Sequence, residues 1–248
     1  MSIKNYTREQ IEAGLANHEP ALKERIRLLF VNNFITDENF DRICRLYSNL
    51  KGSYYDTVVI IEKYPGNTDK LLPLVSNETF DTPLGSVLAN DPLRNDFCDE
   101  DDDFFLDDSG YSENMALYDH LMMLQCVLKD FNVVSIQIAD SRPSIVRELA
   151  AAIEELLRER NALVVLCSNI SESEKTVLND LYGRIKAKET SRLFNFLNTG
   201  DARIRGTGPF MAGVLVADKW ELDHHFISLE PNKTPHLAGC ATLKKYQG

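Results

Sequence analysis

The chain has 248 residues, 44% of them hydrophobic, which is enough to bury the core of one large domain or two small ones. Its net charge of −11 argues against a general nucleic-acid binder or a binder of anionic membranes, because phosphate contacts require clustered lysines and arginines. The five cysteines are widely spaced without a C-x-x-C motif, which predicts reduced thiols. The amino-terminal stretch is polar and no apolar run has the length of a membrane span, so we expect a cytoplasmic protein.

The first quarter of the chain predicts two helices and two buried strands. Thr7 and Gln10 form a capping-box pattern, and residues 1–24 are interpreted as an amino-terminal helical extension. The apolar run Ile26–Val31 has the length of a buried strand and ends at Asn32 and Asn33. A helix over 37–50 and a second buried strand over 57–61 follow.

Residues 95–110 are predicted to form an acidic surface loop. Eight of the thirteen residues from 96 to 108 are acidic. A calcium loop needs oxygen ligands at fixed alternate positions, and Phe104, Phe105 and Leu106 interrupt that pattern. The segment is therefore interpreted as a solvated loop or as a docking site for a basic partner protein.

The rest of the chain alternates strands with helices. Ser112 is predicted to cap a helix over 113–129, and two further strands lie at 133–139 and 163–167. Helices are expected at 145–158, from Ser171 onward and at 190–197, and two closing strands at 223–229 and 236–243. This alternation predicts a single α/β domain over 1–248. Its fold is three-layered, with a largely parallel central sheet, helices on both faces and a carboxyl-terminal antiparallel hairpin.

The stretch RIRGTGPF leads into an apolar helix and is a candidate anion site. Gly206 permits a sharp turn, Pro209 suits the first turn of a helix, and helix starts offer free N–H groups. Arg203 and Arg205 add positive charge. The alternative is an ordinary loop-to-helix junction with solvated arginines.

Motifs for several kinds of catalysis are missing from the sequence. No G-x-S-x-G elbow, Walker loop or Rossmann G-x-G-x-x-G is present. His224 and His225 are neighbours on a predicted strand and therefore point to opposite faces, although one of them could pair with His236 across the hairpin. No cofactor is predicted.

With this order of elements, the chain resembles the Memo family, which shares the α/β fold of the catalytic subunit of class III extradiol dioxygenases. The resemblance covers roughly residues 26–243. It rests on the segments ETFDTPLGSV, YSENMALYDHLMMLQ, LVVLCSNIS, RIRGTGPFMAGVLVA and HLAGCATL.

The departures from the family pattern fall on its metal site. The resemblance places the metal ligands of the family at positions that carry Asn, Tyr, Ala, Glu or Arg here, and one of its histidines falls at Ala116. Only Ser112 is retained. Amides and arginine are weak or repelling ligands for transition metals. The candidate ligand-binding residues are Asn32, Asn33, Tyr111, Ser112, Asn114, Asn169, Glu172 and Arg205, and no metal site is predicted.

Three hypotheses of function follow from this comparison. The favoured one is a non-catalytic binding or scaffold protein whose remodelled polar pocket accepts a small anionic ligand. The alternatives are an enzyme that uses Tyr111, Ser112, Glu172 and Arg205, or a metal-dependent dioxygenase-like enzyme. The third is a protein-interaction module that uses the acidic segment. The sequence predicts neither the oligomeric state nor the identity of the partner.

Overall fold

The computed structural model describes residues 2–66, 68–170, 175–198, 204–227 and 237–244. Its strands are β1 (Ile26–Val31), β2 (Thr57–Lys63), β3 (Leu72–Leu74), β4 (Thr79–Thr82), β5 (Gly85–Leu88), β6 (Phe104–Leu106), β7 (Asn132–Ile138), β8 (Ala162–Cys167), β9 (Asn169–Ile170), β10 (Ile204–Arg205), β11 (Asp223–Phe226) and β12 (Gly239–Thr242). Its helices are α1 (Arg8–Ala16), α2 (Phe40–Tyr47), α3 (Asp91–Glu100), α4 (Ala116–Val127), α5 (Pro143–Leu157), α6 (Lys175–Lys186), α7 (Thr190–Asn198) and α8 (Thr207–Lys219). Two 3₁₀ turns, η1 (Ile3–Asn5) and η2 (Ser48–Leu50), complete the set.

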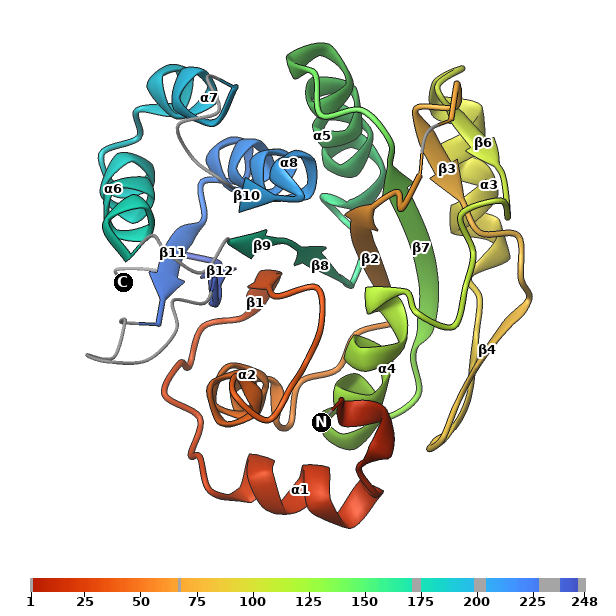
Figure 1. Cartoon of the computed structure of the whole chain (residues 1–248), viewed down its shortest axis with the longest axis vertical. Coiled ribbons are helices and arrows are strands. Elements are labelled where there is room, and N and C mark those ends of the chain that lie inside the picture. Colours follow the sequence, from red (N-terminus) through yellow and green to blue (C-terminus); the bar gives the residue numbers. More distant parts are fainter. Residues whose placement is uncertain (1, 67, 171–174, 199–203, 228–236, 245–248) are drawn as a thin grey trace.

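The centre of the molecule is an eight-stranded mixed sheet in the order β11-β12-β1-β8-β2-β7-β3-β6 (Figure 1). The four middle strands β1, β8, β2 and β7 run parallel. On one side β12 pairs antiparallel with β1 and with β11. On the other side β3 pairs antiparallel with β7 and parallel with β6. The predicted fold class is confirmed, including the closing antiparallel hairpin.

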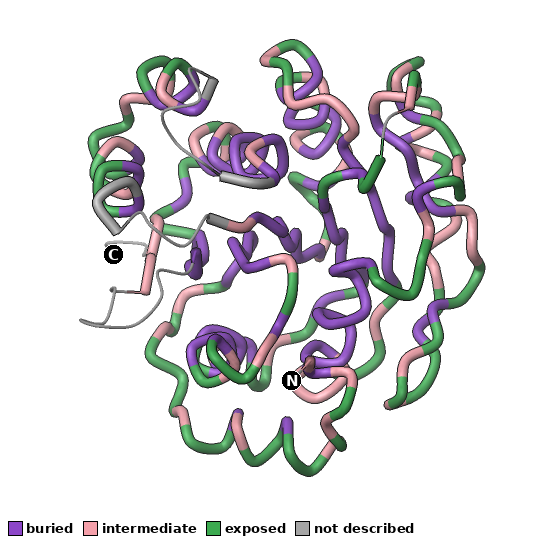
Figure 2. Tube along the Cα trace, viewed as in Figure 1, coloured by how far each residue is buried: buried purple, intermediate pink, exposed green. Residues whose placement is uncertain are grey.

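Helices cover both faces of the sheet. The helices α1, α2 and α4 pack with η1 on one face, and α3, α5, α6, α7 and α8 lie on the other (Figure 1). The middle strands are buried along almost their whole length, as Figure 2 shows. Strands covered on both faces need apolar side chains in both directions, which explains the continuous runs IRLLFV and ALVVLC.

The acidic segment is more ordered than predicted. Helix α3 continues to Glu100, and β6 follows at Phe104. The side chain of Asn90 caps α3 by accepting a hydrogen bond from the Leu93 N–H at 3.1 Å, and Leu93 and Phe97 are buried. The prediction of a loop is therefore wrong, because the spacing of buried apolar residues outweighs the acidic composition.

The helix predicted from Glu113 begins three residues later, at Ala116. Ser112 lies outside it and does not cap it. The first N–H groups of α4 instead donate to the carboxylate of Glu62, which follows from the tertiary fold rather than from the local sequence.

At the amino terminus the capping box of Thr7 and Gln10 is present, as predicted. Ile11 and Leu15 of α1 are buried in the same core as α2 and α4, and the N–H of Ile3 donates to the Ile35 carbonyl at 3.1 Å. The amino-terminal segment thus belongs to one helical layer of the domain.

At the carboxyl terminus β11 and β12 form the predicted antiparallel pair, with His225 opposite Cys240. Residues 228–236, which include His236, lie outside the described part of the chain, so the predicted pairing across the hairpin lies outside it too. The five cysteines form no disulfide, and Cys44, Cys167 and Cys240 are buried. None of the described helices is both long and apolar enough to cross a bilayer.

Candidate functional site

The carboxyl ends of β1 and β8 carry three of the predicted site residues. Asn32 and Asn33 directly follow β1, and Asn169 lies just beyond β8. Because β1 and β8 are parallel neighbours, their ends meet at the same edge of the sheet. The side-chain oxygen of Asn169 accepts hydrogen bonds from the Asn33 N–H at 3.0 Å and from the Asn32 amide at 3.4 Å. The structure thus brings the three asparagines together.

The backbone of Arg205 reaches the same edge. Arg205 lies opposite Asn169 in the short β9–β10 pair, and Gly206 follows it at φ 80°, in the left-handed region that favours glycine. A Cβ on Gly206 would lie 3.1 Å from the carbonyl oxygen of Cys167. The side chain of Arg205 and all of Glu172 lie outside the described part of the chain. Their role as an anion clamp remains a prediction.

A buried histidine lies beneath Asn32. His120, in α4, is fully buried, and its Nε2 lies 2.7 Å from the Asn32 carbonyl oxygen. A carbonyl can only accept, so Nε2 carries the proton and Nδ1 accepts from the Tyr47 hydroxyl at 2.8 Å. Burial lowers the pKa of His120 to about 4. The ring is therefore neutral, and both of its nitrogens are occupied.

Two buried carboxylates lie on the same side of the sheet. Glu62, in β2, accepts the N–H groups of Ala116 at 2.8 Å and Leu117 at 3.3 Å, and it thereby caps α4. Asp119, in α4, accepts the Ile35 N–H at 2.8 Å with one oxygen. Burial raises the pKa of Glu62 to about 7 and that of Asp119 to about 6.

Several buried oxygens of this region have no hydrogen-bond partner among the described residues. They are Oδ1 of Asn32, Asn33 and Asp119, and Oε1 of Gln137. The side chains of Asn32, Asp119 and Gln137 are at least nine-tenths buried. Since an unpaired buried acceptor is unfavourable, this edge of the sheet is suited to a small group that donates hydrogen bonds.

Tyr111, Ser112 and Asn114 form a second group. The hydroxyl of Tyr111 is hydrogen-bonded to that of Tyr118, and both residues line a cavity of about 440 Å³ beside Lys4 and Glu113. None of the three asparagines lines this cavity. Ser112 and Asn114 are exposed, and the Ser112 hydroxyl accepts the Asn114 N–H at 3.3 Å. Of these three predicted site residues, Tyr111 lines the cavity, whereas Ser112 and Asn114 do not.

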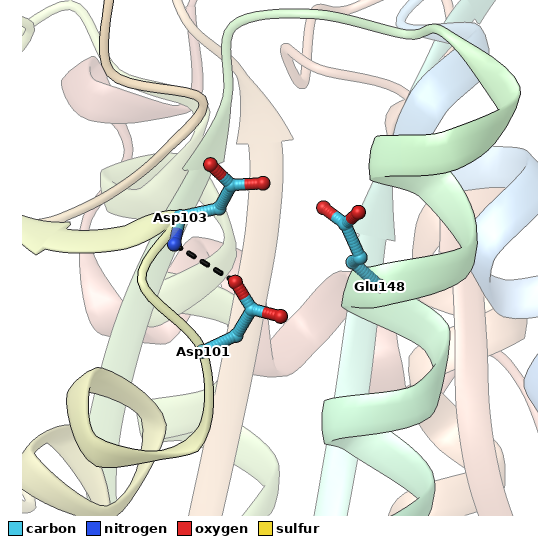
Figure 3. A group of neighbouring side chains, drawn as sticks. All are labelled: Asp101, Asp103 and Glu148. Atoms are coloured by element: carbon cyan, nitrogen blue, oxygen red, sulfur yellow. Dashed lines mark hydrogen bonds between the residues drawn. The ribbon is translucent and has the colours of Figure 1, made fainter.

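Among the described residues, one group of side chains has the spacing of a metal site, and it lies away from these strand ends. Asp101 and Asp103, in the turn before β6, face Glu148 in α5, and one oxygen from each lies within 4.8 Å of the others (Figure 3). The Asp101 carboxylate accepts the Asp103 N–H at 2.9 Å.

Glu62, Asp119, His120 and Gln137 were not predicted as site residues. Glu62 was detectable, because it directly follows a predicted buried strand. Asp119 and His120 lie inside a helix with an apolar pattern, where two adjacent polar residues at buried positions were the available signal. His120 lies one turn beyond Ala116, the position at which the resemblance placed a family histidine.

The structure is thus an α/β protein with buried polar side chains at the carboxyl ends of its parallel strands. The sequence profile of the Memo-like protein family matches residues 4–234. The chain therefore belongs to the Memo-like family, as its sequence motifs predicted.

Two known proteins illustrate this relationship. A MEMO1 family protein from Thermotoga neapolitana is 27% identical in an alignment that covers 81% of this chain and 85% of that protein. The crystal structure of an uncharacterized protein from Escherichia coli K12 has a TM-score of 0.57 at 15% identity and covers 88% of this chain and all of that one. At this identity the second similarity shows the fold alone.

Proposed function

We propose that this protein is a non-catalytic member of the Memo-like family that binds a small zwitterion, such as an amino acid, at the carboxyl ends of β1 and β8. The proposal rests above all on the oxygens of Asn32, Asn33 and Asp119 that have no hydrogen-bond partner in the described part of the chain. Leaving a buried acceptor unpaired costs about 1–3 kcal/mol, so a ligand that donates to these oxygens gains affinity.

The acceptors determine the charge of the ligand at this end. Asp119 is a carboxylate above pH of about 6, and the amide oxygens of Asn32 and Asn33 carry partial negative charge. An ammonium group offers three N–H donors and the opposite charge. The anionic half of the proposed ligand is inferred from the sequence alone. It would bind the side chain of Arg205, which lies outside the described part of the chain.

The state of His120 supports a binding role without catalysis. A general base needs a free nitrogen and a pKa near the working pH. His120 has neither, since Asn32 and Tyr47 occupy both nitrogens and its pKa is about 4. The asparagines at the positions implied by the resemblance are also poor transition-metal ligands.

A thermal-shift series separates the two halves of the ligand. Glycine carries both charges, methylamine carries only the cation and acetate only the anion. At pH 7.5 we expect glycine to raise the melting temperature most, methylamine to raise it less and acetate to leave it unchanged. At pH 5, where Asp119 is protonated, the effect of methylamine should largely disappear.

A pair of variants assigns the effect to the site. Asn32→Leu removes the acceptor and should abolish the shift with glycine. Asn49→Ala removes an asparagine whose oxygen accepts the Ala21 and Leu22 N–H groups elsewhere, and it should leave the shift unchanged. A shift with acetate alone would contradict the donor-binding site. Stoichiometric iron, zinc or copper in the purified protein would favour the metal-dependent dioxygenase-like enzyme instead.

A further inference from the structure

Strand β6 forms one edge of the eight-stranded sheet, and its outer side faces no other strand in the described part of the chain. The Asp103 carbonyl accepts the Leu72 N–H at 3.1 Å, and the Asp107 N–H donates to the Leu74 carbonyl at 2.9 Å. The backbone N–H and C=O groups of the odd-numbered residues in and beside β6 therefore point toward β3. Backbone groups alternate along a strand, so the N–H and C=O of Leu106 point to the open edge.

The same edge exposes apolar side chains. Phe105 is 42% exposed and Leu106 is 46% exposed, and both follow the buried Phe104. An edge strand with free backbone groups and apolar side chains is a template for the addition of another strand.

Carboxylates of like charge face each other between α5 and the turn that leads into β6. One carboxylate oxygen from each of Asp101, Asp103 and Glu148 lies within 4.8 Å of the others. Figure 3 shows the three side chains turned toward one another. Glu100, at the end of α3, lies close enough to Glu155 of α5 for the repulsion between the two carboxylates to contribute to a raised pKa of Glu100. Glu148 and Glu155 are seven residues apart and lie on one side of α5. The result is an acidic seam between α5 and the turn before β6.

Repulsion within the seam changes its protonation. The neighbouring carboxylate of Asp103, followed by burial, raises the pKa of Glu148 to about 7, and burial together with Glu155 raises the pKa of Glu100. Arg142 opposes this rise in the pKa of Glu148 but does not cancel it. Its guanidinium forms an ion pair with the carboxylate of Asp140 at 2.5 Å. A cation from outside the chain would relieve this repulsion.

We propose that β6 binds a lysine- or arginine-rich segment of another protein as an added β-strand, with the basic side chains of that segment placed over the acidic seam. Charge complementarity selects this occupant over a second copy of the chain. Two copies joined edge to edge would bring two acidic seams together, and like charges across a strand pair are destabilising.

The test uses a synthetic peptide of about eight residues with alternating lysine and valine, a length typical of single strands. Fluorescence anisotropy measures its binding to the full chain at low and moderate salt. We expect saturable binding that weakens with salt, and protection of the Leu106 N–H from hydrogen exchange. A peptide of the same charge with N-methylated backbone amides should bind roughly tenfold more weakly, because it cannot complete the ladder.

Two variants examine the backbone and the charge separately. Leu106→Pro removes one outward N–H without touching a bond to β3, and Leu106→Lys adds a repelling charge at an exposed position. Both should weaken binding roughly tenfold. The charge-neutralising pair Asp103→Asn and Glu148→Gln should weaken binding and reduce its dependence on salt. Glu38→Gln, an exposed acid elsewhere, is the matched control and should have no effect.

Four results would overturn the proposal. The first is that the N-methylated peptide binds as tightly as the unmodified one, and the second is that the peptide shows no saturable binding at all. The third is that the chain associates with itself and Leu106→Lys abolishes this association. The fourth is that calcium binds at Asp101 and Asp103 while the peptide does not bind. Circular dichroism and thermal melting establish that each variant is folded. If Leu106→Pro does not fold, Leu106→Lys and the N-methylated peptide still decide the outcome.

Discussion

Glu62 shows how one side chain links the sheet to the polar site. It ends the buried part of β2, is only 6% exposed and caps α4 through two backbone N–H groups. The cap favours its ionised form, and burial opposes ionisation more strongly, so its pKa rises from 4.5 to about 7. Because the Glu62 carboxyl is still partly protonated at neutral pH, the free energy of unfolding should depend on pH through this residue.

The substitution Glu62→Gln should remove that coupling. A carboxyl whose pKa is raised by folding stabilises the protein fully below pH 4.5, and this stabilisation is lost as pH rises through about 7. The free energy of unfolding of Glu62→Gln minus that of the wild type should therefore increase by about 3 kcal/mol between pH 4.5 and 8. Urea unfolding at both pH values measures this difference. A difference that is constant with pH would contradict the assignment.

The fully buried pair Tyr47 and His120 gives a second prediction. Tyr47→Phe leaves Nδ1 of His120 without a donor, which should lower the free energy of unfolding by about 1–3 kcal/mol. The control is Tyr54→Phe, whose hydroxyl donates to Asp56 at an exposed position and should change stability by less than about 0.5 kcal/mol. Equal effects of the two substitutions would show that the Tyr47 hydrogen bond is not structural.

The polar residues at the ends of the strands were easier to predict from the sequence than the buried polar residues of α4 that lie next to them. Asn32, Asn33 and Asn169 were recognised because polar residues directly after apolar runs are visible in one dimension. His120 and Asp119 were missed because their partners, Asn32 and Ile35, are more than eighty residues away in the chain. The local sequence shows two adjacent polar residues within an apolar helix, but it does not show which distant residues they contact.

At the scale of elements, helix α8 sets how closely the helical layer approaches the sheet. A Cβ on Gly213 would lie 2.2 Å from Leu166 Cδ1 and 2.8 Å from Phe30 Cε1, both fully buried side chains. Glycine at this point lets α8 lie directly on β8 and β1. The start of α8, beside Asn169, is thereby fixed relative to the ends of these strands.

Gly213→Ala should therefore destabilise the protein by about 1–3 kcal/mol, because Leu166 and Phe30 must shift in a packed core. Gly183→Ala in α6 is the matched control, since nothing lies within 4 Å of its Cβ position. Alanine there should stabilise the chain by up to about 1 kcal/mol through helix propensity. Thermal unfolding of both variants tests the contrast, and a neutral Gly213→Ala would show that α8 does not pack as tightly as described.

The elements that the sequence mispredicted share one cause. The segment 95–110 looked like a loop by composition, and α4 appeared to begin near Ser112 by its capping pattern. In both cases tertiary contacts decided the outcome, through the burial of Phe97 and Phe104 and through the cap from Glu62. The parallel middle of the sheet was predictable, because strands buried on both faces are continuously apolar.

At the scale of the whole molecule, the proposed functions lie at two different places on one sheet. The proposed small-molecule site lies at the carboxyl ends of β1 and β8, and the proposed docking edge is β6, four strands away from β8 in sheet order. The two proposals are therefore independent. We expect the substitution Asn32→Leu to leave binding of the basic peptide unchanged, and Leu106→Lys to leave the thermal shift with glycine unchanged.

The most direct test of the ligand site is a crystal structure of the protein soaked with glycine. The ammonium group should lie within about 3.2 Å of Oδ1 of Asn32 and of Asp119, so that oxygens without a partner among the described residues gain donors. A metal ion at this edge, or glycine bound elsewhere with these oxygens paired to water alone, would contradict the account.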